Sequence, residues 1–145
     1  MIDSILRHLF APQPTTFDDP DATLALTALM VRVARSDGAY SGDEIAQIDR
    51  VLAERHRLDA KEAADLRAQA EVLEAAAPDT VRFTRALKGA VPLDLRRRLV
   101  EALWTIALAD GRRDVEEDRL LRLVSSLLGL TDVDSALARQ KAEQR

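Results

Sequence analysis

The sequence of 145 residues contains no cysteine and no long apolar run. Without cysteine, disulfides, zinc sites built on thiolates and cysteine nucleophiles are excluded, which fits a reducing compartment. The longest strongly apolar run, residues 24–31, is broken by a threonine and followed by Arg32, far short of the roughly 20 residues that span a bilayer. Residues 1–10 are too short for a signal peptide and carry Arg7 and His8 within their apolar pattern. We therefore expect a cytoplasmic protein without a transmembrane segment.

Glycine and histidine are also scarce, with five and two residues. Four glycines are expected to terminate helices: Gly38, Gly89, Gly111 and Gly129. The fifth, Gly42, is expected in a first helix turn. No glycine is then left for a loop that binds phosphate. His8 and His56 stand alone, without the serine–carboxylate spacing of a nucleophilic site, so we expect no enzyme. A net charge of −4 and a pI of ≈ 5.2 disfavour nucleic acid as a partner.

Apolar residues recur at helical spacing along almost the whole chain, and β-branched runs are scarce. The pattern predicts an all-α, single-domain bundle of about eight helices. Residues 1–14 form an amphipathic helix and a linker with Pro12 and Pro14, and residues 15–145 form the domain on which this helix docks. The last helix is expected to run through Leu137 and then to fray. Capping signals mark the predicted helix starts: Asp19 before Pro20, Ser41 with Glu44, Asp59 with Glu62, Asp79, Asp114 with Glu117, and Thr131 with Asp134.

One pattern occurs twice, at a constant offset of 73 residues: an apolar helix, then Asp-Gly, then a glutamate seven residues after the aspartate. The first copy is Asp37-Gly38 with Glu44, and the second is Asp110-Gly111 with Glu117. This predicts two pseudo-repeated helical hairpins, residues 20–76 and 92–142. Because each has one rich apolar face, we expect them to pack about a pseudo-two-fold axis that buries the second and sixth helices.

The two acidic turns match only the second half of an EF-hand loop. The positions of the first two ligands hold Val33 and Arg35 in one copy and Ile106 and Leu108 in the other, which excludes an EF-hand. A sufficient alternative without metal is that both aspartates accept loop N–H groups while both glutamates complete capping boxes.

An aspartate at a helix C-terminus is nevertheless unfavourable by roughly 0.3–1 kcal/mol. Further carboxylates, those of Asp43, Glu116 and Asp118, lie close by in the sequence. The candidates that offset this charge are the N-terminus of the next helix, Arg35, the pair Arg112-Arg113, or a divalent cation. Oxygen ligands suit calcium or magnesium, and the lack of histidine or cysteine ligands disfavours zinc.

Four other features receive structural interpretations. The arginines at positions 96–98 point about 100° apart around a helix, so they do not form one patch for phosphate or nucleic acid. Trp104 is expected in the core and His56 at a helix C-terminus, where a cation is favourable. Glu101 either faces solvent or pairs with an arginine of the first copy.

These motifs together resemble the tellurite-resistance TerB family of bacterial all-helical proteins. The resemblance covers residues 24–137 and is carried by residues 33–38 with Glu44, by Asp79 with residues 83–85, by residues 103–104 and 109–111 with Glu117, and by residues 127–130. Ser36 departs from the alanine expected before the first Asp-Gly. The resemblance implies a compact bundle of two pseudo-repeats, a stress-response association, and metal binding through Asp37, Asp43, Glu44, Asp110, Glu116 and Glu117.

We therefore expect a non-catalytic module of a bacterial stress response, associated with tellurite resistance, that binds a divalent cation weakly through its acidic turns. The alternative function is a helical adaptor for a protein partner or for self-association. In that case the two hairpins present a groove for a partner helix, and the N-terminal helix occupies that groove.

Overall fold

The computed structural model describes residues 2–10, 19–36, 38, 40–77, 79–108 and 115–144, without the side chains of residues 8, 19, 20 and 115–117. Over these ranges the chain forms eight helices and no strand, which confirms the predicted all-α class. The helices are α1 (Ile2–Phe10), α2 (Asp19–Ala34), α3 (Gly42–His56), α4 (Ala60–Ala76), α5 (Thr80–Ala90), α6 (Leu93–Ala107), α7 (Val115–Leu127) and α8 (Asp132–Glu143). None of the helices in the described ranges combines the length and the apolar character that a bilayer crossing requires.

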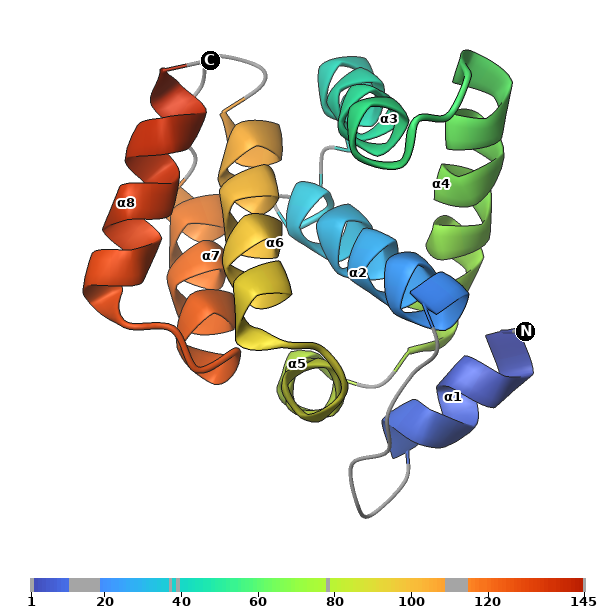
Figure 1. Ribbon diagram of the computed structural model, residues 1–145, viewed down its shortest axis with the longest axis horizontal. Helices are drawn as coiled ribbons and strands as arrows, with labels where there is room; N and C mark the ends of the chain where they lie inside the picture. Colours follow the sequence, from blue (N-terminus) through green and yellow to red (C-terminus); the bar gives the residue numbers. More distant parts are fainter. Residues whose placement is uncertain are drawn as a thin grey trace.

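Helix α2 lies at the centre of the bundle, between the α6–α8 group and α4 (Figure 1). It packs against α3, α4, α5, α6 and α7. All residues of the apolar run 24–31 except Leu26 are buried, and the buried hydroxyl of Thr27 donates to the carbonyl of Thr23 at 2.7 Å. A helix that is apolar on nearly every side can thus be surrounded by other helices without leaving this polar group unsatisfied.

Helix α6 is the second central helix, and it packs most extensively on α8. Trp104 is 2% exposed, which confirms its predicted place in the core. Its indole N–H donates to Ser135 Oγ at 3.4 Å, and the guanidinium of Arg139 lies 5.0 Å from its ring centroid. These contacts, with the burial of Ala138 and Ala142, continue α8 to Glu143, beyond the Leu137 expected from the sequence.

Four helix starts follow the predicted caps, whereas α2 begins at Asp19 itself, the residue predicted to precede it as N-cap. Reciprocal capping boxes join Ser41 with Glu44, Asp59 with Glu62, and Thr131 with Asp134, and Asp79 accepts the N–H of Arg82. The predicted box of Asp114 and Glu117 lies outside the described residues and side chains. Each cap satisfies backbone N–H groups that a first helix turn leaves without a partner.

The helix ends differ more from expectation. Helix α2 ends at Ala34, before Gly38. The C-cap of α3 is Arg57, in the left-handed region at φ 52°, and not His56. Burial and then the charge of Arg55 lower the pKa of His56, which is opposite to the favourable imidazolium expected at a helix C-terminus.

Helix α1 docks on α4 and α5, as predicted for the N-terminal arm (Figure 1). Ile5 and Leu9 are 0% and 3% exposed. Burial of these two side chains stabilises the docked helix by about 3–6 kcal/mol.

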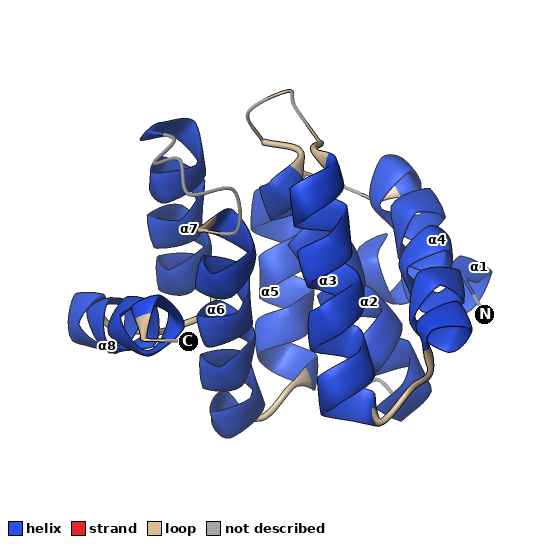
Figure 2. Ribbon diagram, turned by 90° about the horizontal axis from the view of Figure 1, so that it is seen from above, coloured by secondary structure: helices blue, strands red, loops and turns tan. Residues whose placement is uncertain are grey.

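The two central helices lie side by side (Figures 1 and 2). Helix α2 packs most extensively on α4 and helix α6 on α8, and these pairs hold corresponding places in residues 20–76 and 92–142. The duplication, the pseudo-two-fold axis and the domain bounds stay predictions.

Candidate functional site

The first acidic turn joins α2 to α3. After Ala34, the hydroxyl of Ser36 donates to the carbonyl of Val33 at 2.7 Å. Gly38 has φ +79°, a left-handed conformation that glycine adopts without the steric cost of a Cβ. Asp37, the first predicted ligand, lies outside the described residues. The structure describes the residues that flank this turn in α2 and α3.

Glu44 has the capping role of the metal-free alternative. Its side chain is buried, with the residue 1% exposed. Carboxylate oxygen Oε1 accepts the N–H of Ser41 at 3.2 Å and the hydroxyl of Ser41 at 3.1 Å, while the N–H of Glu44 donates to Ser41 Oγ at 3.1 Å. Asp43, one residue earlier in the first turn of α3, is exposed. The two predicted ligands of α3 thus differ, because one serves a buried cap and the other faces solvent.

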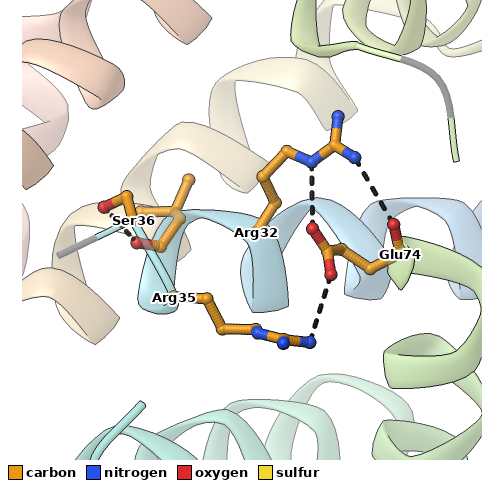
Figure 3. Close-up of polar contacts among 5 residues, drawn as sticks. Arg32, Arg35, Ser36 and Glu74 are labelled. Carbon is orange, nitrogen blue, oxygen red and sulfur yellow. Dashed lines mark hydrogen bonds and ion pairs between the residues drawn. The ribbon is translucent and has the colours of Figure 1, made fainter. Parts of the chain in front are cut away.

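Arg35, a predicted counter-charge for the first turn, reaches instead to α4 (Figure 3). Its Nη1 donates to Oε2 of Glu74 at 3.3 Å. Arg32 holds the same residue from α2, with Nε donating to Oε1 at 3.1 Å and Nη2 to the backbone carbonyl at 3.4 Å. Glu74 carries one negative charge and is shared by two arginines, so it balances the charge of Arg35 only in part. The ion pair nevertheless directs this side chain toward α4.

A second polar cluster surrounds Tyr40, just before the cap of α3. Arg67 of α4 bridges two helices, with Nε donating to Asp49 at 2.6 Å and Nη1 to Glu71 at 3.1 Å. Burial, and then the nearby carboxylate of Glu71, raise the pKa of Tyr40 from 10.0 to about 12. The guanidinium of Arg35 lies 5.9 Å from the tyrosine ring centroid. No local signal predicts this cluster, because its members come from α3, α4 and the turn between α2 and α3.

The second acidic turn lies largely outside the described residues. Helix α6 ends at Ala107 and helix α7 begins at Val115, and Asp110 and Arg112-Arg113 lie outside the described residues. The backbones of Glu116 and Glu117 lie in the first turn of α7, the end at which a helix favours negative charge. Their side chains are outside the described part of the chain.

Among the described side chains, no three His, Cys, Asp or Glu residues lie together in a group that could hold a metal ion. The described side chains do not include those of four of the six predicted ligands: Asp37, Asp110, Glu116 and Glu117. The metal site therefore stays a prediction. In donor chemistry, carboxylate oxygens fit a hard cation such as calcium or magnesium.

Two polar hollows flank α6, and neither was predicted from the sequence. A cleft of ≈ 240 Å³ between α3 and α6 is lined by Val51, Glu54, Arg55, Arg98, Glu101, Ala102 and Thr105. A hollow of ≈ 410 Å³ lies between α6 and α8, and Arg98 and Glu101 line it as well. Glu101 is thus half-buried in a cleft that also holds Arg55, an arginine of the first copy.

The three consecutive arginines of α6 do not share one environment. Arg96 points inward and donates to the backbone carbonyls of Val91 and Leu128. Arg97 lies 3.8 Å from a carboxylate oxygen of Asp94 and 3.9 Å from one of Asp134. Arg97 and Arg98 both line the hollow between α6 and α8, and Arg98 also lines the cleft between α3 and α6. Because Arg96 lies apart from the other two, the three side chains do not form one basic patch.

Comparison with protein families matches residues 23–140 to the family model described as tellurite resistance protein TerB. Comparisons with curated proteins and with solved structures found no match. The matched range contains α3 to α7 and most of α2 and α8, and it leaves α1 outside.

Proposed function

The chain belongs to the TerB family, and we propose that it is a non-catalytic module of a bacterial stress response that binds a divalent cation weakly through its acidic turns. The cation would be held by carboxylates of Asp37 and Asp43 in the first turn and of Asp110, Glu116 and Glu117 in the second. The description of the family supports the link to tellurite resistance. The lack of a nucleophile–base arrangement in the sequence supports a non-catalytic role.

The ion pair of Arg35 with Glu74 is the observation that carries this proposal. It draws a candidate counter-charge of the first acidic turn toward α4, which supports the N-terminus of α3 or a cation as the partner of this turn. The exposed carboxylate of Asp43 adds an accessible oxygen ligand at this position. Glu44 would contribute less, because one of its oxygens serves the cap of α3.

Metal titration tests the proposal. Calcium, magnesium or manganese added to metal-free protein should raise the melting temperature, because a ligand that binds only the folded state stabilises it, by about 2.7 kcal/mol at 100 times its Kd. The double variant Asp37→Asn, Asp110→Asn should lose most of this shift. Asp65→Asn, at an exposed position of α4, is the matched control and should keep it. An unchanged melting temperature at millimolar metal, or an equal shift in both variants, would count against cation binding.

A second candidate function is a helical adaptor. Its groove for a partner helix would be the surface of α4 and α5 on which α1 docks with Ile5 and Leu9 buried. The family match begins at residue 23, so α4 and α5 lie within the matched range and α1 lies before it.

A labelled peptide of residues 1–14 tests the adaptor function. In the full-length variant Ile5→Asp the chain's own helix is destabilised, and the peptide should bind in trans with a fluorescence anisotropy increase. A peptide with the same Ile5→Asp change is the control and should not bind. If the wild-type peptide fails to bind this variant while circular dichroism shows a folded bundle, the groove is not a helix receptor.

A further inference from the structure

Two cations from different helices meet beside Gly129, in the turn between α7 and α8. A Cβ at this glycine would lie 3.1 Å from Nη1 of Arg96 and 3.5 Å from Nζ of Lys88, so the two nitrogens are no further apart than the sum of these distances. Within the described ranges, neither cation forms an ion pair with a carboxylate. Like charges this close repel each other, and an anion placed between them would be attracted by both.

The hydrogen bonds at the end of α7 leave the ammonium of Lys88 unused. The N–H of Leu130 donates to the carbonyl of Ser125 and that of Gly129 to the carbonyl of Ser126, both at 2.9 Å, as in a Schellman motif. The stem of Lys88 covers Gly129, with Cε 3.0 Å from the position of an added Cβ. Its ammonium has no hydrogen bond with a described residue, so it is available to a ligand.

Two backbone carbonyls hold the guanidinium of Arg96 in place. Its Nε donates to the carbonyl of Val91 at 3.0 Å, and its Nη1 donates to that of Leu128. The side chain is partly buried, and its Nη2 donates to none of the described residues. A guanidinium that is fixed along one edge and unused along another presents N–H donors in a defined direction, which suits an oxyanion.

Helix α5 extends this positive charge along the surface. It carries Arg82, Arg85 and Lys88 at intervals of three residues, and it contains no acid. All three side chains are exposed. Arg85 has no ion pair within the part of the chain that the structure describes, and Arg82 lies 3.9 Å from Asp79 in a pair exposed to solvent, which is weak. In a chain of net charge −4, this face produces a local positive potential that attracts anions.

We propose that Lys88 and Nη2 of Arg96 bind a phosphate group beside Gly129, and that Arg85 and Arg82 attract the ligand toward this site. A tetrahedral phosphate offers separate oxygens to donors on two helices, at about 2.7–2.9 Å for charge-assisted hydrogen bonds. Two converging cations favour a dianion over a singly charged carboxylate. The phosphate belongs to a free ion or to a lipid headgroup. This site is independent of cation binding in the acidic turns and of the surface on which α1 docks.

Titration of the metal-free, full-length protein with inorganic phosphate tests the site. In ¹H–¹⁵N NMR spectra, phosphate that replaces chloride at constant ionic strength should cause saturable shifts centred on the amides of residues 128–131. Lys88→Gln should weaken binding about tenfold, because one charge-assisted hydrogen bond is lost, and Lys88→Arg should restore it. Lys61→Gln is the matched control, at an exposed position in the first turn of α4, away from α5 in Figure 1, and it should bind phosphate like the wild type.

Vesicles distinguish the two sources of the phosphate group. If the ligand is a lipid headgroup, the wild type should sediment with vesicles of equimolar phosphatidylcholine and phosphatidic acid, but not with phosphatidylcholine alone. Lys88→Gln should then stay in solution, and Lys61→Gln should sediment. Saturable NMR shifts with inorganic phosphate, without sedimentation, would assign the site to a free phosphate.

Two results would overturn the phosphate site. One is the absence of both saturable shifts at millimolar phosphate and sedimentation with the acidic vesicles. The other is equal weakening by Lys88→Gln and Lys61→Gln, which would show unspecific attraction by surface charge. Circular dichroism of each variant checks that the bundle is folded. The metal titration reads the acidic turns separately, so failure of the phosphate site leaves cation binding untouched.

Discussion

The ring of Tyr40 lies between the first acidic turn and the α3–α4 hairpin. Arg67 donates to the carboxylates of Asp49 and Glu71 at 2.6 and 3.1 Å, so one positive charge faces two negative charges beside the tyrosine. Ionised tyrosine would add a further negative charge beside Glu71 in a partly buried place. The neutral phenol is therefore the favoured form of Tyr40 in the folded protein.

This preference predicts an alkaline loss of stability. The pKa of Tyr40 is about 12 in the folded state, against 10.0 for an unperturbed phenol. Between these values the folded state keeps a proton that the unfolded state has lost, so the free energy of unfolding falls as pH rises, by at most about 1.4 kcal/mol per pH unit. Urea denaturation from pH 8 upward should show this fall in the wild type and a smaller one in Tyr40→Phe.

The same change is visible spectroscopically, because the chain has one tyrosine. The phenolate absorbance of the folded protein should titrate near pH 12 and that of urea-unfolded protein near pH 10. A folded-state midpoint near 10 would contradict the role assigned to burial and Glu71.

Among the candidate site residues, those whose partners are close in sequence were predictable. Glu44 and its capping partner Ser41 are three residues apart, and the predicted box is confirmed. Arg35 was assigned to the acidic turn because it precedes Asp37 by two residues, yet it pairs with Glu74, 39 residues away. An ion pair forms between groups that are close in space, whatever their separation in the sequence. The packing of α4 on α2 brings Glu74 close to Arg35.

At the scale of the helix, the end of α7 depends on a glycine and two cations. Gly129 has φ +82°, and a Cβ there would lie 3.0 Å from Lys88 Cε and 3.1 Å from Arg96 Nη1. Arg96 also donates to the carbonyl of Leu128, the residue directly after α7. The helix end is therefore closed by side chains of α5 and α6.

Gly129→Ala should lower the free energy of unfolding by about 1–2 kcal/mol, because an L-residue is strained in the left-handed region. The loss should be somewhat larger than this strain alone, because the added Cβ displaces the guanidinium of Arg96. Gly38→Ala, with φ +79° but nothing within 4 Å of the added Cβ, should show the conformational part alone. Gly42→Ala, in the first turn of α3, has no positive φ and open space, and should be neutral or stabilising. Equal losses at all three positions in urea denaturation would contradict this account.

Helix starts were predicted better than helix ends. A start carries its own signal, since the cap side chain and the N–H groups that it satisfies lie within four residues. The end of α8 carries no such signal: the polar sequence after Leu137 suggests fraying, but burial of Ala138 and Ala142 on the bundle keeps it helical to Glu143. Alanines such as Ala138 and Ala142 do not by themselves indicate which face of a helix is buried, because this depends on the helix that packs against them.

At the scale of the whole molecule, α2 and α6 form the core and α1 is peripheral. Leu29 of α2 is completely buried, and α2 packs against five other helices. Unfolding of α2 therefore requires unfolding of the bundle, whereas α1 can leave its groove while the other helices stay packed.

Leu29→Ala should lower the free energy of unfolding by about 2–5 kcal/mol through the cavity that it creates. Leu123→Ala, in α7 at a position 48% exposed, is the matched control and should change it by less than about 0.5 kcal/mol. Urea denaturation followed by Trp104 fluorescence measures both.

Hydrogen exchange of the wild type measures how the stability of α1 differs from that of α2 and α6. Amides of α1 should exchange through a local opening of low free energy, and those of α2 and α6 only through global unfolding. Protection of α1 equal to that of α2 would show that the N-terminal helix is an integral part of the core.

The periodicity of apolar residues, the caps and the prolines suffice to specify an all-α chain, its helix starts and its two most apolar helices, because each of these depends on residues within one or two turns. The pairing of Arg35 with Glu74, the enclosure of Tyr40, the closed end of α7 and the polar clefts beside α6 required the tertiary structure. Each of them depends on which helices become neighbours, and the free energy of that choice is distributed over many apolar contacts that no local pattern encodes.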